Sequence, residues 1–132
     1  MKIVRDNVGK EWTLKLDYSA ALRIRSEHGI NLTSLKTVDK LVDSILDDLT
    51  LAIRMAWSMI DDRSGITFEE FANRFTGDSL DRLIDAVLQE CFDFFPFEKM
   101  RTALRLGWLR GREEIDRNLE QMIEKMMHET SL

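Results

Sequence analysis

The sequence predicts a mainly α-helical fold: a compact helical bundle around a central apolar helix at about residues 38–61, with a small N-terminal β-hairpin. The stretch from Leu49 to Ile60 has nine apolar residues among twelve and contains neither Gly nor Pro. A helix that is apolar nearly all round belongs inside a bundle. Apolar residues also recur at helical spacing through most of the chain, whereas only residues 2–16 alternate as a strand does.

Length and composition fit one domain, residues 1–132, which is long enough to bury a core without disulfides or metal. The net charge of −5 argues against a general nucleic-acid-binding protein. The single cysteine, Cys91, is expected to be a buried apolar side chain in a reducing compartment. The amino terminus lacks the apolar segment of a signal peptide, and the densest apolar run is shorter than the ~18 residues that span a bilayer. We therefore expect a cytoplasmic protein that does not enter the membrane.

A β-hairpin is expected at residues 2–16. Trp12, Leu14 and Leu16 alternate with Thr and Lys, and an Asn-Val-Gly-Lys segment before them supplies turn residues. A hairpin alone is marginally stable in water. Its apolar face should therefore lie against the helices.

Residues 17–129 are expected to be helical, apart from the connections between helices. Asp17 is a suitable N-cap for the first helix, and Gly29 is a suitable residue to end it. A connector then leads to the central helix. The sequence therefore predicts a short first helix of about three turns.

The central helix should have one polar edge. Thr50, Arg54 and Ser58 recur every four residues, and Asp47 lies close to the same stripe. This edge is expected to face water or a partner, while the other sides of the helix face the core.

Two later helices are marked by capping residues. Thr67, with Glu70 three residues later, is typical of a capping box. Asp78 or Ser79 caps the next helix. That helix should end before Pro96, which cannot donate a backbone hydrogen bond.

The last helix is expected at about residues 97–129, with an interruption near Gly107 or Gly111. Its second half carries an apolar stripe rich in methionine. The stripe consists of Ile115, Leu119, Met122, Ile123, Met126 and Met127. Periodicity leaves two interpretations open. Either the stripe packs on the bundle, or the helix projects and the stripe binds another copy or a client.

The segment from Asp61 to Phe71 is similar in composition to a calcium-binding EF-hand loop, but its residues do not match the ligand positions of such a loop in any alignment. With Glu70 as the last ligand the first ligand would be Met59, and with Gly65 at the sixth position the first would be Ile60. A helix–loop–helix without a cation is therefore the better interpretation. No metal or cofactor is expected.

No catalytic arrangement stands out in the sequence. His28 and His128 lie at expected helix ends and have no second ligand or base at a suitable spacing. Gly-rich phosphate loops and nucleophile motifs are not evident. We expect a protein that is not an enzyme.

A basic stretch without an intervening acid contains Lys99, Arg101, Arg105, Arg110 and Arg112. In an unbroken helix Arg101, Arg105, Trp108 and Arg112 share one face. Arginines beside an aromatic ring are typical of phosphate or single-strand binding. Because the whole chain is acidic, the favoured interpretation is that Glu113, Glu114 and the acidic helices supply the counter-charges.

Four segments together resemble a known family. They are Lys15 to Arg25 with Gly29 to Leu32, the apolar central helix, Gly65 to Phe71 (Gly-Ile-Thr-Phe-Glu-Glu-Phe), and Phe94-Phe-Pro. In order and spacing they look like the small tail assembly chaperones of long-tailed bacteriophages and prophages. The resemblance covers about residues 12–97.

The resemblance implies a non-enzymatic, oligomeric protein of the host cytoplasm that binds and solubilises the tape measure protein during tail assembly. In this reading we expect the client surface to be bordered by Phe94, Phe95, Phe97, Met122, Met126 and Met127. Two alternatives remain open. One is a structural virion component such as a head–tail connector or tail-completion protein, and the other is a nucleic-acid-binding regulator that uses the basic stretch.

Overall fold

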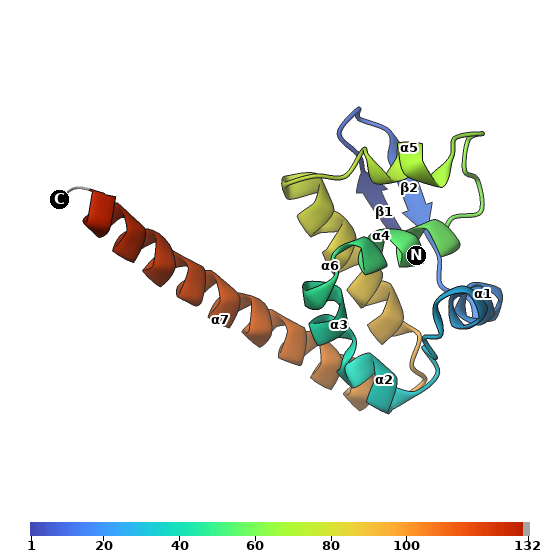
Figure 1. Ribbon diagram of the computed structural model, residues 1–132. Helices are drawn as coiled ribbons and strands as arrows, with labels where there is room; N and C mark the ends of the chain where they lie inside the picture. The colour runs from blue at the N-terminus through green and yellow to red at the C-terminus, as the bar shows by residue number, and fades with distance from the viewer. Residues whose placement is uncertain (131–132) are drawn as a thin grey trace.

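The computed structural model describes residues 1–130 and confirms a mainly α-helical fold with an N-terminal hairpin. The described chain has one two-stranded antiparallel sheet and seven helices (Figure 1). The elements are β1 (Lys2–Arg5), β2 (Glu11–Leu14), α1 (Tyr18–His28), α2 (Leu35–Asp39), α3 (Leu41–Asp47), α4 (Thr50–Ser58), α5 (Phe68–Ala72), α6 (Asp78–Asp93) and α7 (Glu98–Thr130). No helix within residues 1–130 combines the length and the apolar composition needed to cross a bilayer.

The hairpin pairs β1 with β2 in antiparallel register, with Val4 opposite Trp12. Val4, Trp12 and Leu14 are buried against the helices, as the alternation predicts. Asp6 organises the turn: its carboxylate accepts hydrogen bonds from two backbone N–H groups of the turn and from Trp12 Nε1 at 2.9 Å. Burial alone would raise the pKa of Asp6, but these hydrogen bonds outweigh it and lower the pKa below its usual value.

The first helix begins and ends where the sequence predicts. The Asp17 carboxylate accepts a hydrogen bond from Ala20 N at 2.8 Å, and Gly29 adopts a left-handed conformation with φ 70°. A residue with a Cβ is strained at such a φ, which explains a glycine here. Ala20, Ala21 and Ile24 are the buried side of α1.

The single central helix predicted at residues 38–61 is wrong, because this stretch forms the separate helices α2, α3 and α4. The break between α3 and α4 lies at Asp48. Its backbone is extended, with φ −146° and ψ 94°, and its carboxylate accepts hydrogen bonds from the Thr50 N–H and hydroxyl. An aspartate that caps the next helix in this way competes with continuation of the preceding one.

The polar edge predicted for the central helix is exposed at only one of its ends. Thr50 is exposed and Arg54 is half-buried, where Arg54 pairs with Asp48 at 3.1 Å. Ser58 is buried, because α1 covers it: its hydroxyl lies 3.3 Å from the Glu27 carboxylate. The edge therefore faces solvent at its start and α1 at its end.

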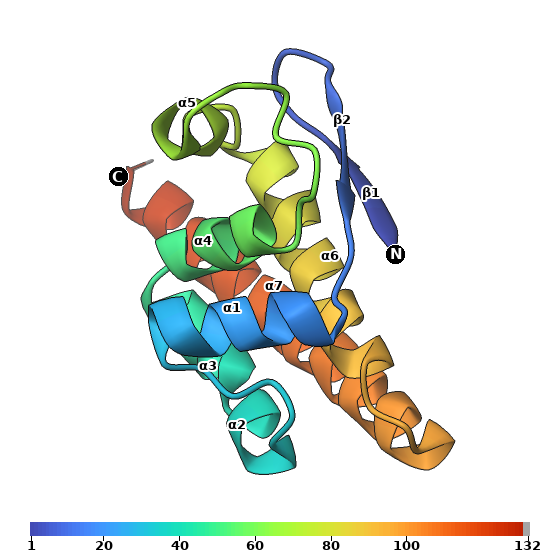
Figure 2. The ribbon, with the colours of Figure 1, turned by 90° about the vertical axis from the view of Figure 1, so that its right-hand side faces the viewer.

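Helix α6 connects the hairpin to the later helices. It packs on β1 and β2, on α4 and on α7, and Figure 2 shows it between the hairpin and α4. Its buried apolar residues follow the predicted rhythm and include Leu83, Ile84, Val87, Leu88 and Cys91. Burial and the neighbouring Glu90 raise the pKa of the Cys91 thiol far above its usual value, so the thiol stays protonated and unreactive.

Helix α7 is continuous from Glu98 to Thr130, so the expected interruption at Gly107 or Gly111 does not occur. Its first half lies against the bundle. From Asp116 to Thr130 every residue is exposed, and Figure 1 shows this half projecting away from the body. The structure thus decides between the two arrangements that the sequence left open.

Candidate partner-binding surface

The first half of α7 is fixed to the body by side chains on one of its faces. Arg105 forms an ion pair with Asp93, and the indole N–H of Trp108 donates to Asp85 at 2.9 Å. Arg112 donates two hydrogen bonds to the Asp81 carboxylate, at 2.7 and 2.9 Å. All three acids lie on α6.

These contacts turn the predicted basic face toward α6, where Trp108 is buried and the arginines are half-buried. Arg101, Arg105, Trp108 and Arg112 do share one face of an unbroken helix. Arg101 donates to the Phe95 carbonyl at 2.7 Å rather than to an acid. The acids of α6, not Glu113 and Glu114, supply the ion pairs, so this face offers a phosphate backbone few unpaired cations.

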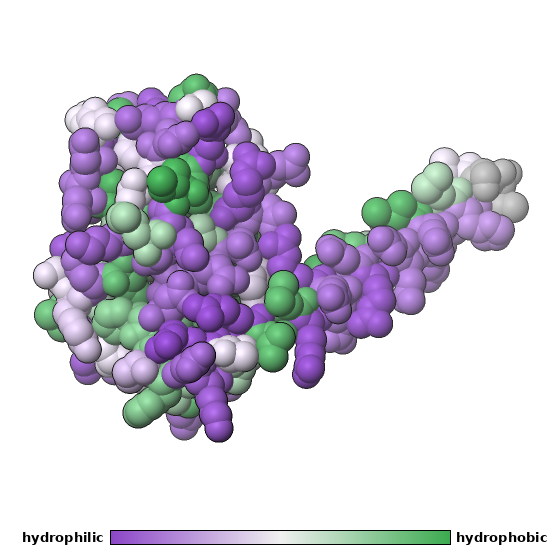
Figure 3. All heavy atoms as spheres, turned by 180° about the vertical axis from the view of Figure 1, so that it is seen from behind, coloured by the Kyte–Doolittle hydropathy of each residue, from purple (hydrophilic) through white to green (hydrophobic). Residues whose placement is uncertain are grey.

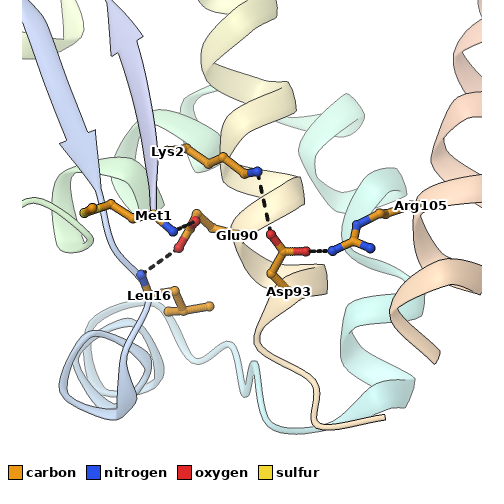
Figure 4. A network of polar contacts seen from close by, with 6 residues as sticks. All are labelled: Met1, Lys2, Leu16, Glu90, Asp93 and Arg105. Carbon is orange, nitrogen blue, oxygen red and sulfur yellow. Dashed lines mark hydrogen bonds and ion pairs between the residues drawn. The ribbon is translucent and has the colours of Figure 1, made fainter. Parts of the chain in front are cut away.

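A second set of acidic contacts on α6 holds the amino terminus, and sequence patterns did not predict it. Glu90 is buried and lies 2.6 Å from the Met1 ammonium, and it also accepts a hydrogen bond from Leu16 N at 3.0 Å. Asp93 reaches Lys2 at 3.7 Å as well as Arg105 (Figure 4). One turn of α6 therefore ties the hairpin and α7 to the same helix.

The face of α7 that contacts α6 continues along the projecting half. Arg105, Trp108, Arg112, Ile115, Leu119, Met122 and Met126 are spaced alternately three and four residues apart. This is the spacing of a coiled-coil seam, on which facing side chains interlock. The structure shows α6 covering the seam as far as Arg112, and no described element covering it beyond Ile115.

We call the exposed continuation the α7 stripe, and it consists of Ile115, Leu119, Met122 and Met126. Ile115 is half-buried, whereas Leu119, Met122 and Met126 are 48%, 54% and 58% exposed. Ile123 and Met127 border the stripe and are also exposed. Figure 3 shows hydrophobic, green side chains along one edge of the projecting helix, most of which is otherwise purple.

The phenylalanines expected to border the same surface lie elsewhere. Phe95 is 6% exposed and belongs to the core, so it is unavailable to a client. Phe94 is half-buried, with its ring 5.0 Å from that of Tyr18. Phe97 is 64% exposed, but along α7 it precedes Met122 by about 37 Å at 1.5 Å per residue. The phenylalanines and methionines therefore do not form one continuous surface.

A hollow lies where α7 leaves the body. It measures about 210 Å³ and is lined by residues of α3, α6 and α7, including Leu46, Ile84, Trp108 and Ile115. Leu46 of α3 is 45% exposed at this hollow. The α7 stripe thus begins at a recess that is lined by these apolar side chains and by Asp81, Arg112 and Asp116.

The segment from Asp61 to Phe71, considered above as a calcium-binding loop, contains contacts of another kind. The Arg63 guanidinium lies 4.4 Å from the centre of the Trp57 ring and donates to the Trp57 carbonyl at 3.1 Å. The Asp62 carboxylate accepts a hydrogen bond from Ser64 N. Among residues 1–130, His, Cys, Asp and Glu side chains do not gather in groups of three or more that could hold a metal ion.

No protein-family model, curated protein or solved structure matches this chain. The α7 stripe is accordingly the candidate site on its geometry alone.

Proposed function

We propose that this protein is a non-enzymatic assembly chaperone that binds an apolar helix of a long client protein and keeps that client soluble. The observation that carries the proposal is the α7 stripe: apolar side chains at coiled-coil spacing, exposed on a helix that extends from a folded body. The resemblance of residues 12–97 to phage tail assembly chaperones names the client as a tape measure protein, in the cytoplasm of the bacterial host.

The chemistry of the stripe suits a client with irregular apolar surfaces. Met122 and Met126 are unbranched and polarizable, so they adapt to different partner side chains. Together with the bordering Ile123, the stripe places Leu119, Met122 and Met126 at the i, i+3, i+4 and i+7 spacing by which an apolar helical face is recognised. Glu113, Glu120 and Glu124 lie on the sides of α7 away from the stripe and keep a loaded complex hydrated.

The test is co-expression with the tape measure protein of the same phage or prophage. Replacing Met122, Met126 and Met127 by Glu places three charges on and beside the stripe, and we expect the soluble client fraction to fall by at least tenfold. The control replaces Arg117, Gln121 and His128 by Glu on the same helix outside the stripe. Full client solubility with the triple methionine variant would contradict the proposal.

A second measurement separates a chaperone from a structural part of the particle. An assembly chaperone leaves before the tail is complete, so mass spectrometry of purified particles should find the tape measure protein without this chain. A stoichiometric amount of the chain in the particles would instead support a connector or tail-completion role.

A further inference from the structure

The projecting half of α7 exposes an apolar face that no described element covers. Its apolar residues Leu119, Met122 and Met126 are each about half exposed or more. A helix of about 15 residues is marginal in water unless its apolar face is packed. We propose that two copies of the chain pair through their α7 stripes as an antiparallel coiled coil.

The stripe is complementary to itself in one antiparallel register. In that register Leu119 of each copy lies opposite Met122 of the other, and Ile115 lies opposite Met126. All four stripe residues then meet apolar partners, as the core layers of a coiled coil require. The next layer outward pairs Arg112 of one copy with Glu129 of the other.

Charge decides between the antiparallel and the parallel arrangement. A parallel pair in register would place Arg112 opposite Arg112 and Glu129 opposite Glu129, and like charges at a seam are destabilising. The antiparallel pair replaces both clashes with attraction between opposite charges. Arg112 already binds Asp81 through Nη2 and lies 3.7 Å from Asp85 through Nη1, but a guanidinium has five donors, so its remaining N–H groups can reach a further carboxylate at the rim of the pair.

The positions beside the seam also permit two copies to meet, although the projecting half is acidic. Glu113, Glu120 and Glu124 lie away from the stripe and point outward from the pair. Beside the seam, Asp116 of one copy faces Ile123 of the other, and Asn118 faces Lys125. No like charges oppose each other there, so the acidic character of the helix does not prevent pairing.

The same register fills the recess at the base of α7. With Leu119 opposite Met122, Thr130 of one copy lies opposite Gly111 of the other. The end of each α7 therefore reaches the hollow of about 210 Å³ beside Leu46 and Ile84. The partner helix continues, along the seam, the cover that α6 provides as far as Arg112.

This pairing stands apart from the proposed function, because two copies would associate without any client. If the client also binds the α7 stripe, it must displace the second copy. A dimeric wild-type chain that does not solubilise the client would count against the proposed function only, whereas a monomeric wild-type chain that does solubilise it would count against the dimer only.

The first experiment measures the mass of the full chain by sedimentation equilibrium. We expect twice the chain mass at micromolar concentration, and association weakened at least tenfold by Met122→Asp. The matched control is Gln121→Asp, which adds the same charge at the next residue, outside the stripe, and should remain a dimer. Both variants should melt as folded proteins, because both residues are exposed. A monomeric wild type, or a Met122→Asp dimer of unchanged affinity, would overturn the proposal.

The second experiment tests the orientation with one spin label at Thr130→Cys. Cys91 is buried and does not compete for the label. In the antiparallel pair the two labels lie about 19 residues apart along the axis, or ~28 Å. In a parallel pair they would be separated by little more than the ~10 Å between helix axes. A short distance between the labels would refute the antiparallel arrangement.

Discussion

The two halves of α7 belong to one helix and share one seam, yet they are held in opposite ways. Residues 98–115 lie on α6 and bury Trp108 to 5% exposure, with Arg105 and Arg112 paired to acids of α6. Residues 116–130 carry Leu119, Met122 and Met126 on the continuation of that face, and all are exposed. The seam therefore continues beyond the helix that covers it.

The difference follows from the lengths of two helices. Helix α6 has 16 residues and α7 has 33, so about half of α7 has no length of α6 to pack against. The change of residue type coincides with this limit: arginines and a tryptophan face the acids of α6, and aliphatic and methionine side chains follow. The docked part of the seam is polar and paired within the protein, whereas its projecting part is apolar and is the surface that we propose binds another helix.

The largest loss of stability is expected from a substitution in the core of the body, on which the first half of α7 packs. Ile53 on α4 is 7% exposed and belongs to the core. The substitution Ile53→Asp buries a carboxylate without a partner and removes apolar contacts. Together these changes should lower the free energy of unfolding by several kcal/mol, out of about 5–15 kcal/mol for a typical domain. Circular dichroism should show loss of the cooperative thermal transition. A melt within a few degrees of the wild type would mean that α4 is not part of a rigid core.

A smaller but still large effect is expected where the first half of α7 docks. Trp108→Ala removes a buried indole, and such substitutions cost about 3–5 kcal/mol. Urea denaturation should show this loss of unfolding free energy, and hydrogen exchange should show lower protection in residues 98–115. Leu109→Ala is the control, because Leu109 is the next residue, is 53% exposed and should change stability by less than about 0.5 kcal/mol. Equal effects at both positions would show that this half of α7 is not docked through Trp108.

The features that the sequence predicted correctly depend on neighbours a few residues away. Asp17 marks the start of α1 and Gly29 its end, through hydrogen bonds to groups three or four residues away. Residue type and position were therefore sufficient to predict both ends. The break between α3 and α4 at Asp48 was not predicted, because it depends on a choice that local pattern does not determine. The Asp48 carboxylate can either face solvent within a long helix or cap α4, and the surrounding apolar pattern is the same in both cases.

The candidate surface was predictable in composition but not in placement. Helical spacing identified the methionine stripe, yet the same spacing describes a buried face and a projecting one. Phe95 was misplaced because an aromatic residue beside Pro96 is equally suited to a core corner and to a surface rim. The overlooked signal was the unequal length of the last two helices, since a long amphipathic helix after a short one leaves part of its apolar face uncovered.

The smallest effect should come from the ion pair at the boundary between the two halves. Arg112 and Asp81 are partly exposed, with side chains 33% and 57% accessible, and exposed ion pairs contribute about 0.2–1 kcal/mol. Arg112→Ala should therefore lower the unfolding free energy by less than about 1 kcal/mol in low salt. The difference from the wild type should shrink near 1 M salt, where charges are screened within about 3 Å.

The control for this last variant is Arg110→Ala, which removes an exposed arginine from the outer side of the same turn. Its stability should match that of the wild type at both salt concentrations. Denaturation has to be compared in the Met122→Asp background, so that changes in self-association do not contribute to the measured stability. A loss of several kcal/mol for Arg112→Ala, insensitive to salt, would show that Arg112 holds α7 by packing on the Trp108 ring, 5.5 Å away, rather than by its charge. The boundary between the docked and projecting halves would then be set by apolar contact on both sides.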